Sequence, residues 1–119
     1  IVNIGSIAGK EVYAKGNVYC ATKFAVDALT RGMRIDMLSH GIKVSQIAPG
    51  AAETEFSTVR FKGDMDAVAN VYKGFAPLQA EDIAEAVLWV TGLPAHVNIN
   101  DMTIMPTAQA SPGYIHKIL

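Results

Sequence analysis

The chain has 119 residues, half of them hydrophobic and 18% charged, and its formal net charge is -1. This composition excludes a disordered polyanion, a basic nucleic-acid-binding arm and a low-complexity chain. The length allows one domain with a sizeable core, and no apolar run approaches the roughly 20 residues of a membrane span, so we expect neither nucleic acid nor membrane as a partner.

The first third of the chain predicts a strand, a loop and a long helix. The apolar run Ile1 to Gly5 is typical of a buried parallel strand, which needs neighbours on both sides, so we expect this chain to be the C-terminal part of a longer one. Small residues and glycines predict a loop over Ser6 to Gly16. From Asn17 to about His40 apolar residues recur at helical spacing, and Gly41 ends the helix. The stripe expected to face the core consists of Ala21, Phe24, Ala25, Ala28, Leu29 and Met33.

The middle of the chain completes a strand–helix–strand unit. Residues 42–47 predict the second strand, ended by Pro49 and Gly50. Such a unit has parallel strands and a right-handed crossover. The polar stretch from Ala51 to Gln79 is typical of a ligand-covering loop, with one short helix over Met65 to Tyr72.

The last third predicts one more helix and one more strand. An amphipathic helix is expected over Glu81 to Val90, ended by Gly92. A short strand is expected near Met102 to Met105, and the tail from Thr107 to Leu119 has no clear period. This alternation of strands and helices indicates the α/β class.

Three side chains stand out where the first strand meets the long helix. Tyr19 and Lys23 are one helical turn apart, so the ammonium can lie near the phenol. A free phenol has a pKa of about 10, and a nearby cation favours the phenolate, which lets Tyr19 act as a general acid or base toward an alcohol or ketone. Ser6, at the strand's carboxyl end, could hold the same oxygen. Taken alone, the pair also fits an interfacial tyrosine beside a solvated lysine.

Three motifs, Asn3 to Gly9, Tyr19 to Ala25 and Ala48 to Phe56, follow one another along the chain. The order of these motifs and the interval between Ser6 and Tyr19 resemble those of the short-chain dehydrogenase/reductase family. The resemblance covers nearly the whole chain. Three further stretches are similar to the NADP-dependent 3-hydroxy acid dehydrogenases of that family, also called serine or allo-threonine dehydrogenases. These stretches are residues 56–63, 93–100 and 106–112.

The resemblance implies a fold and a set of roles. The chain would form the C-terminal part of a Rossmann-type doubly wound parallel sheet, with the N-terminal, nucleotide-binding half missing. Tyr19 would donate or accept the proton, Lys23 would lower the pKa of Tyr19 and bind the nicotinamide ribose, and Ser6 would orient the substrate oxygen. Tyr19 and Lys23 would thus also meet the cofactor, NADP, with NAD left open. The loop expected to line the nicotinamide is Pro49, Gly50, Ala51, Ala52, Glu53 and Thr54.

The expected reaction is hydride transfer between NADP and the CH–OH group of a small, serine-like 3-hydroxy acid. Arg60 is either a bidentate partner for the acid's carboxylate or a surface arginine. A reductase of other carbonyl compounds and a non-catalytic truncated remnant stay open as alternatives. The resemblance also implies a homo-oligomer, a dimer or a tetramer.

The cysteine and histidine content of the chain limits disulfide formation and metal binding. Cys20 is the only cysteine, so an internal disulfide is impossible, and a reducing cytoplasm is the expected location. The three histidines are far apart in the sequence, so we expect no metal site. The expected partner is a small-molecule substrate.

Overall fold

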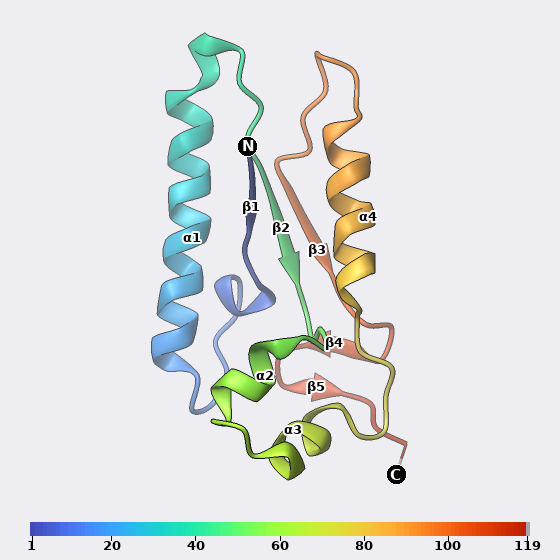
Figure 1. Cartoon of the computed structure of the whole chain (residues 1–119). Coiled ribbons are helices and arrows are strands. Elements are labelled where there is room, and N and C mark those ends of the chain that lie inside the picture. Colours follow the sequence, from blue (N-terminus) through green and yellow to red (C-terminus); the bar gives the residue numbers. More distant parts are fainter. Residues whose placement is uncertain (119) are drawn as a thin grey trace.

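The computed structural model describes residues 1–118. Its central sheet has three parallel strands in the order β1 (Val2–Ile4), β2 (Ser45–Pro49) and β3 (Asp101–Ile104). Two helices, α1 (Asn17–Asp36) and α4 (Ala80–Thr91), lie on either side of the sheet and both contact β2 (Figure 1). The α/β class and the parallel sheet expected from the sequence are therefore confirmed.

The central strand is the most buried element. Ile47 and Ala48 have no exposed surface, because β2 is paired on both edges and covered on both faces, and Val44 just before the strand is equally buried. Its bounds differ from the predicted residues 42–47, since β2 begins at Ser45 and includes Pro49. The partner strands set these bounds: β1 reaches only to Ser45 at one end, and β3 pairs as far as Pro49 at the other. The same pairing starts β3 at Asp101, one residue before the predicted Met102.

The long helix ends earlier than predicted. It stops at Asp36, and one 3₁₀ turn, η2 (Leu38–His40), follows it. Gly41 then has a φ of 66°, the left-handed conformation that glycine adopts without a Cβ clash, and it ends this 3₁₀ turn rather than the α-helix itself.

The predicted apolar stripe of α1 is wrong in its orientation. Phe24 and Leu29 are 42% and 64% exposed, and Ala21, Ala25 and Ala28 are exposed with them. Of the stripe only Met33 is half-buried. The buried residues of α1 are Cys20 and Thr30. Asn3 on β1 donates a hydrogen bond to the Thr30 hydroxyl at 3.0 Å. A polar group on the sheet therefore helps to turn a partly polar side of α1 toward the sheet.

A polar cluster of Lys10, Asp27, Gln46 and Asp101 completes this contact between α1 and the sheet. The Lys10 ammonium lies 2.6 Å from Asp27 and 2.5 Å from Asp101, and the Gln46 amide donates to both carboxylates at 2.8 Å. Burial of Asp27 raises its pKa, but hydrogen bonds from Lys10, Arg31 and Gln46 together outweigh burial and hold the pKa at about 2. The cluster thus joins α1, β2, β3 and the segment after β1.

The remaining elements gather beyond the carboxyl ends of the strands (Figure 1). They are α2 (Glu55–Arg60), α3 (Met65–Tyr72) and a hairpin of β4 (Gln109–Ser111) and β5 (Tyr114–Ile115). The bounds of α3 match the prediction, whereas α2 and the hairpin are absent from it. Strands this short cannot display an alternating pattern.

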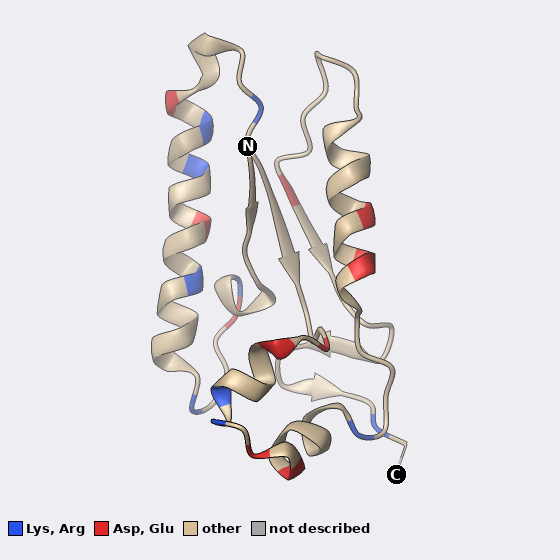
Figure 2. Ribbon diagram, in the orientation of Figure 1, with Lys and Arg blue, Asp and Glu red and all other residues tan. Residues whose placement is uncertain are grey.

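Helix α4 begins one residue before the predicted Glu81, because the carboxylate of Asp82 accepts a hydrogen bond from the Gln79 N–H at 2.7 Å. Acidic and basic side chains are mixed along α1 (Figure 2). None of the helices within residues 1–118 is long and apolar enough to cross a membrane.

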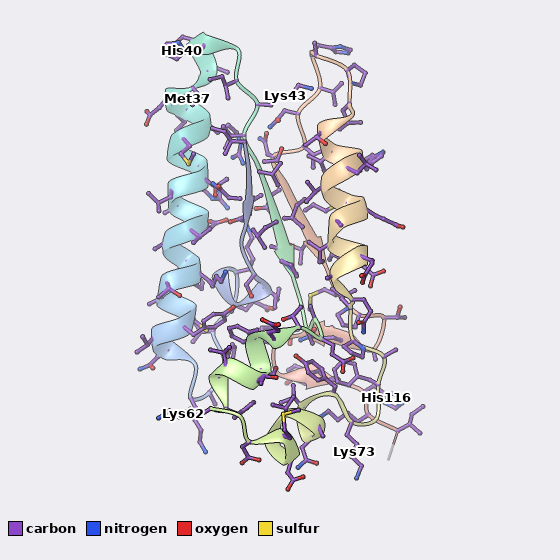
Figure 3. The ribbon with its side chains drawn as sticks, viewed as in Figure 1. Met37, His40, Lys43, Lys62, Lys73 and His116 are labelled. Atoms are coloured by element: carbon purple, nitrogen blue, oxygen red, sulfur yellow. The ribbon has the colours of Figure 1, made fainter. Side chains whose placement is uncertain are left out.

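His40 and His116 lie at opposite ends of the molecule (Figure 3). Within the described residues, no group of three or more His, Cys, Asp or Glu side chains could hold a metal ion.

Candidate active site

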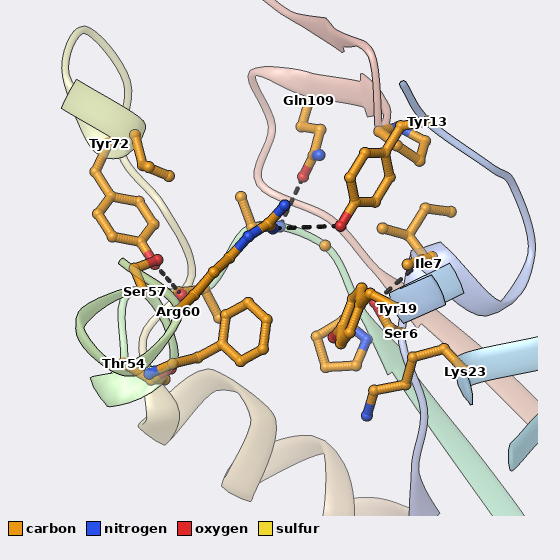
Figure 4. A pocket seen from close by; sticks show the side chains of 18 of the residues that line it. Ser6, Ile7, Tyr13, Tyr19, Lys23, Thr54, Ser57, Arg60, Tyr72 and Gln109 are labelled. Carbon is orange, nitrogen blue, oxygen red and sulfur yellow. Dashed lines mark hydrogen bonds between the residues drawn. The ribbon is translucent and has the colours of Figure 1, made fainter. Parts of the chain in front are cut away.

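A cavity of about 540 Å³ lies at the carboxyl ends of the strands. Its walls come from the end of β1, the first turns of α1, the loop after β2, helices α2 and α3, and the hairpin (Figure 4). This is where ligands of open parallel sheets bind. Ser6, Tyr19 and Lys23 all line it, so the structure brings the three side chains together as the sequence predicted.

Local packing places Ser6 beside the start of α1. The Ser6 hydroxyl caps a 3₁₀ turn, η1 (Ile7–Gly9), by accepting a hydrogen bond from the Ala8 N–H at 3.0 Å. Gly9 then touches the backbone of α1, where a Cβ would lie 2.6 Å from the Lys23 carbonyl oxygen. Only glycine permits this close approach of η1 to α1.

Tyr19 is half-buried, and its ring packs against Phe56 with the ring centres 5.3 Å apart. Burial raises the pKa of the Tyr19 phenol, and a hydrogen bond with Ser6 lowers it by less, so the net direction is upward. The phenol is therefore protonated at neutral pH.

The expectation that Lys23 lowers the pKa of Tyr19 is not met in this structure. The Lys23 ammonium lies 5.9 Å from the centre of the Tyr19 ring and donates a hydrogen bond to the Ile4 carbonyl at 3.4 Å. It is thus engaged with the end of β1 while its side chain stays on the cavity wall.

The loop after β2 is held by hydrogen bonds from three directions. The Ala51 N–H donates to the Gln109 side-chain oxygen at 2.7 Å, and the Ala51 carbonyl accepts from Leu78 at 2.9 Å. The Tyr72 hydroxyl donates to the Ala52 carbonyl at 2.8 Å. Five of the six predicted loop residues line the cavity: Pro49, Gly50, Ala51, Ala52 and Thr54.

The sixth, Glu53, is exposed and lies outside the cavity wall. Its carboxylate accepts a hydrogen bond from the Gln79 side chain at 3.2 Å. The structure thus does not bring Glu53 together with the other predicted residues.

Arg60, at the last turn of α2, also lines the cavity. Its guanidinium donates a hydrogen bond to the Tyr13 hydroxyl at 3.3 Å and lies over the rings of Tyr13 and Phe61, 5.9 and 5.8 Å from their centres. Arg60 is also exposed, so it lies both on the cavity wall and at the surface, and its pairing with a carboxylate stays a prediction.

Four polar residues of the cavity wall were not singled out by the sequence: Tyr13, Ser57, Tyr72 and Gln109. Tyr13 and Gln109 come from stretches without periodicity, and Ser57 lies on the helix that was not predicted. Tyr72 ends a predicted helix, but nothing in its neighbourhood in the sequence points to Ala52.

The donors on the cavity wall suit one end of a dinucleotide. Among residues 1–118 the Ala52 N–H has no acceptor, and Ala52 and Thr54 of the same loop both line the cavity. An amide donor, a hydroxyl and the Lys23 ammonium fit the carboxamide and ribose of a nicotinamide nucleotide. These residues therefore fit the nicotinamide end of the cofactor that the sequence predicted.

Comparisons with known proteins show the family of this chain. Residues 1–64 match the family model described as short chain dehydrogenase. The chain is 48% identical over 119 residues to the NADP-dependent 3-hydroxy acid dehydrogenase YdfG of Salmonella typhi, covering 98% of this chain and 48% of that protein. It is 47% identical over 110 residues to sulfoacetaldehyde reductase 2 of Chromohalobacter salexigens, covering 92% and 44%.

Among solved structures, serine dehydrogenase in its closed form complexed with NADP⁺ superposes with a TM-score of 0.91. That protein is 46% identical, and the match covers 99% of this chain and 48% of the other. The likeness confirms the Rossmann-type fold expected from the sequence. The chain spans about half the length of the relatives it matches.

Proposed function

Because this chain belongs to the short-chain dehydrogenase family, we propose that the protein is an oxidoreductase that transfers a hydride between NADP and a small, serine-like 3-hydroxy acid. One observation carries the proposal. Ser6, Tyr19 and Lys23 line a single cavity, and the guanidinium of Arg60 reaches the same cavity from α2. The cavity thus offers a proton donor, a hydroxyl and a cation to one small acid.

Tyr19 is the group that moves the proton at the substrate oxygen. Its raised pKa keeps the phenol protonated at neutral pH, which suits proton donation to a carbonyl as it is reduced. The Ser6 hydroxyl, which lines the same cavity as the phenol, holds the same oxygen and stabilises the negative charge that develops on it. When bound, NADP supplies or accepts the hydride.

Lys23 and the loop after β2 hold the nicotinamide end of the cofactor. The Lys23 ammonium is the donor for the ribose, and the Ala52 N–H and the Thr54 hydroxyl meet the carboxamide. The NADP-dependent relative and the NADP⁺ complex of serine dehydrogenase support NADP as the cofactor.

Arg60 anchors the acid. A guanidinium pairs with a carboxylate through two parallel hydrogen bonds, and Tyr13 and Phe61 already restrict its position. A guanidinium binds a sulfonate in a similar way, and one relative is a sulfoacetaldehyde reductase. Reduction of a small sulfonate-bearing aldehyde is therefore the second candidate function.

We also propose a homo-oligomer in the cytoplasm. The exposed side of α1 is apolar, with Val18, Leu29 and Ile35 between 64% and 74% exposed, and such a surface supports association between copies. The single cysteine suits a reducing compartment.

A substrate panel tests the proposed reaction. The full-length protein is mixed with NADP and a 3-hydroxy acid, its methyl ester or a hydroxysulfonate, and NADPH formation is recorded. We expect turnover of the free acid and much slower turnover of the ester, which cannot pair with Arg60. Equal rates for acid and ester would contradict the anchoring role, and a lack of turnover with every alcohol and every matching carbonyl would contradict the enzymatic function.

A further inference from the structure

The hydroxyl of Tyr72 joins three segments of the chain at one point. It donates a hydrogen bond to the Ala52 carbonyl at 2.8 Å and pairs with the Ser57 hydroxyl at 2.7 Å (Figure 4). Ala52 belongs to the loop after β2, Ser57 to α2 and Tyr72 to α3. Ser57 is only 4% exposed, so its hydroxyl depends on this partner for a hydrogen bond inside the protein.

The peptide that Tyr72 binds is otherwise fixed on one side only. The Glu53 N–H of that peptide donates to the Leu78 carbonyl at 2.8 Å, and the Ala52 carbonyl on its opposite side is held by Tyr72. Because a peptide unit is planar, its two hydrogen bonds together fix its rotation. Without the phenol, the peptide would keep the Leu78 contact and gain freedom to tilt about it.

This peptide connects the two loop donors that face the cavity. Ala52, whose N–H has no acceptor within residues 1–118, precedes it, and Thr54 follows one residue later. The Ala52 N–H belongs to the preceding peptide, whose Ala51 carbonyl accepts a hydrogen bond from the Leu78 N–H at 2.9 Å. A tilt of the Ala52–Glu53 peptide would therefore move the Thr54 hydroxyl relative to this held amide. Both Ala52 and Thr54 line the cavity, as does Tyr72 itself.

We propose that Tyr72 is a positioning residue for the nicotinamide ring: its hydroxyl, seated on Ser57, fixes the Ala52–Glu53 peptide so that the Ala52 N–H and the Thr54 hydroxyl together match the ring's carboxamide. This inference rests on the proposed NADP-dependent function and assigns Tyr72 no part in proton transfer. The Tyr72 hydroxyl also links α2 and α3, which line the cavity, to the loop that binds the cofactor.

Binding measurements on Tyr72→Phe in the full-length protein test this role. The phenylalanine keeps the ring in place and removes only the hydroxyl. NADPH is compared with 2′-phospho-ADP-ribose, which has the same adenosine and pyrophosphate but no nicotinamide. We expect NADPH affinity to fall about tenfold, the value of one lost hydrogen bond and its dependent contacts, while affinity for 2′-phospho-ADP-ribose stays unchanged. Tyr114→Phe is the matched control, because Tyr114 is 77% exposed, and it should change neither affinity.

Other outcomes would separate the possible failures. Unchanged binding of both compounds to Tyr72→Phe would contradict the positioning role. Equal weakening of both compounds, with a lower melting temperature, would show that Tyr72 acts only on folding. A wild-type protein that binds neither compound would instead contradict the proposed NADP-dependent function on which the inference rests.

Discussion

The guanidinium of Arg60 donates a hydrogen bond to the hydroxyl of Tyr13 at 3.3 Å, so that α2 and the loop before α1 meet at the cavity. The same guanidinium lies over two aromatic rings. A cation held in this way loses little side-chain freedom when it binds an anion, which favours recognition of a charged substrate.

We predict that Arg60→Lys changes substrate preference more than turnover. Lysine keeps the positive charge but cannot form two parallel hydrogen bonds to one carboxylate. The KM for a 3-hydroxy acid should rise about 10- to 100-fold, the usual effect of losing a charged hydrogen bond. The KM for a neutral hydroxy compound should stay the same, and steady-state kinetics with both substrates measures the difference.

Lys62→Ala is the control for charge alone, since Lys62 is exposed and lies just beyond α2, outside the cavity wall. It should leave both KM values unchanged. An Arg60→Lys enzyme with an unaltered preference for the acid would show that Arg60 does not anchor the carboxylate.

The polar cluster predicts how stability depends on pH. The pKa of Asp27 lies at about 2 in the folded protein, below its ordinary value of 3.8. The ionised carboxylate therefore stabilises the fold above about pH 4, and this contribution is lost as the pH falls from about 4 to about 2. Asp27→Asn should lower the free energy of unfolding at pH 7 by about 1 to 2 kcal/mol and reduce its decline over that pH range.

Denaturant unfolding at a series of pH values measures this effect. Glu85→Gln is the control, because Glu85 is exposed on α4 and forms no ion pair in the part of the chain described. If the free energy of unfolding falls equally for wild type and Asp27→Asn between about pH 4 and about pH 2, the stabilising role of the cluster is contradicted.

Gly50 allows the loop after β2 to pack against the hairpin. A Cβ at this position would lie 2.5 Å from the Gln109 side-chain oxygen and 2.7 Å from the Met105 sulfur. Gly50→Ala should therefore destabilise the protein by about 1 to 3 kcal/mol and disturb the hydrogen bond from Ala51 to Gln109. Thermal unfolding measures the loss.

Gly113→Ala serves as its matched control. The turn around Gly113 leaves open space at the Cβ position and does not require a positive φ. The melting temperature of this variant should equal that of the wild type, and an equal effect of the two substitutions would contradict the predicted clash.

Local sequence signals predicted those features that neighbouring residues determine. The bounds of α3, the left-handed conformation of Gly41 after the long helix and the parallel strand–helix–strand unit agree with the structure. Ser6, Tyr19 and Lys23 were found through the motifs that surround them. In each case the residues that cause the feature are close in the sequence.

The features that depend on distant residues were mispredicted or missed. Periodicity shows which residues of α1 are apolar, but Asn3 and Gln46 on the sheet decide which side of the helix faces inward. Tyr72 and Gln109 hold the loop after β2 from elements 20 and 58 residues away. No local pattern can predict contacts over such separations.

The most direct test of the account is the turnover of Tyr19→Phe in the full-length protein. Phenylalanine keeps the packing against Phe56 but has no proton to transfer, so kcat should fall about 10²- to 10⁴-fold, while NADPH binds as it does to the wild type. Tyr114→Phe, prepared in parallel, should retain full activity. A Tyr19→Phe enzyme with wild-type turnover would contradict the assignment of Tyr19 as the proton donor and, with it, the proposed mechanism.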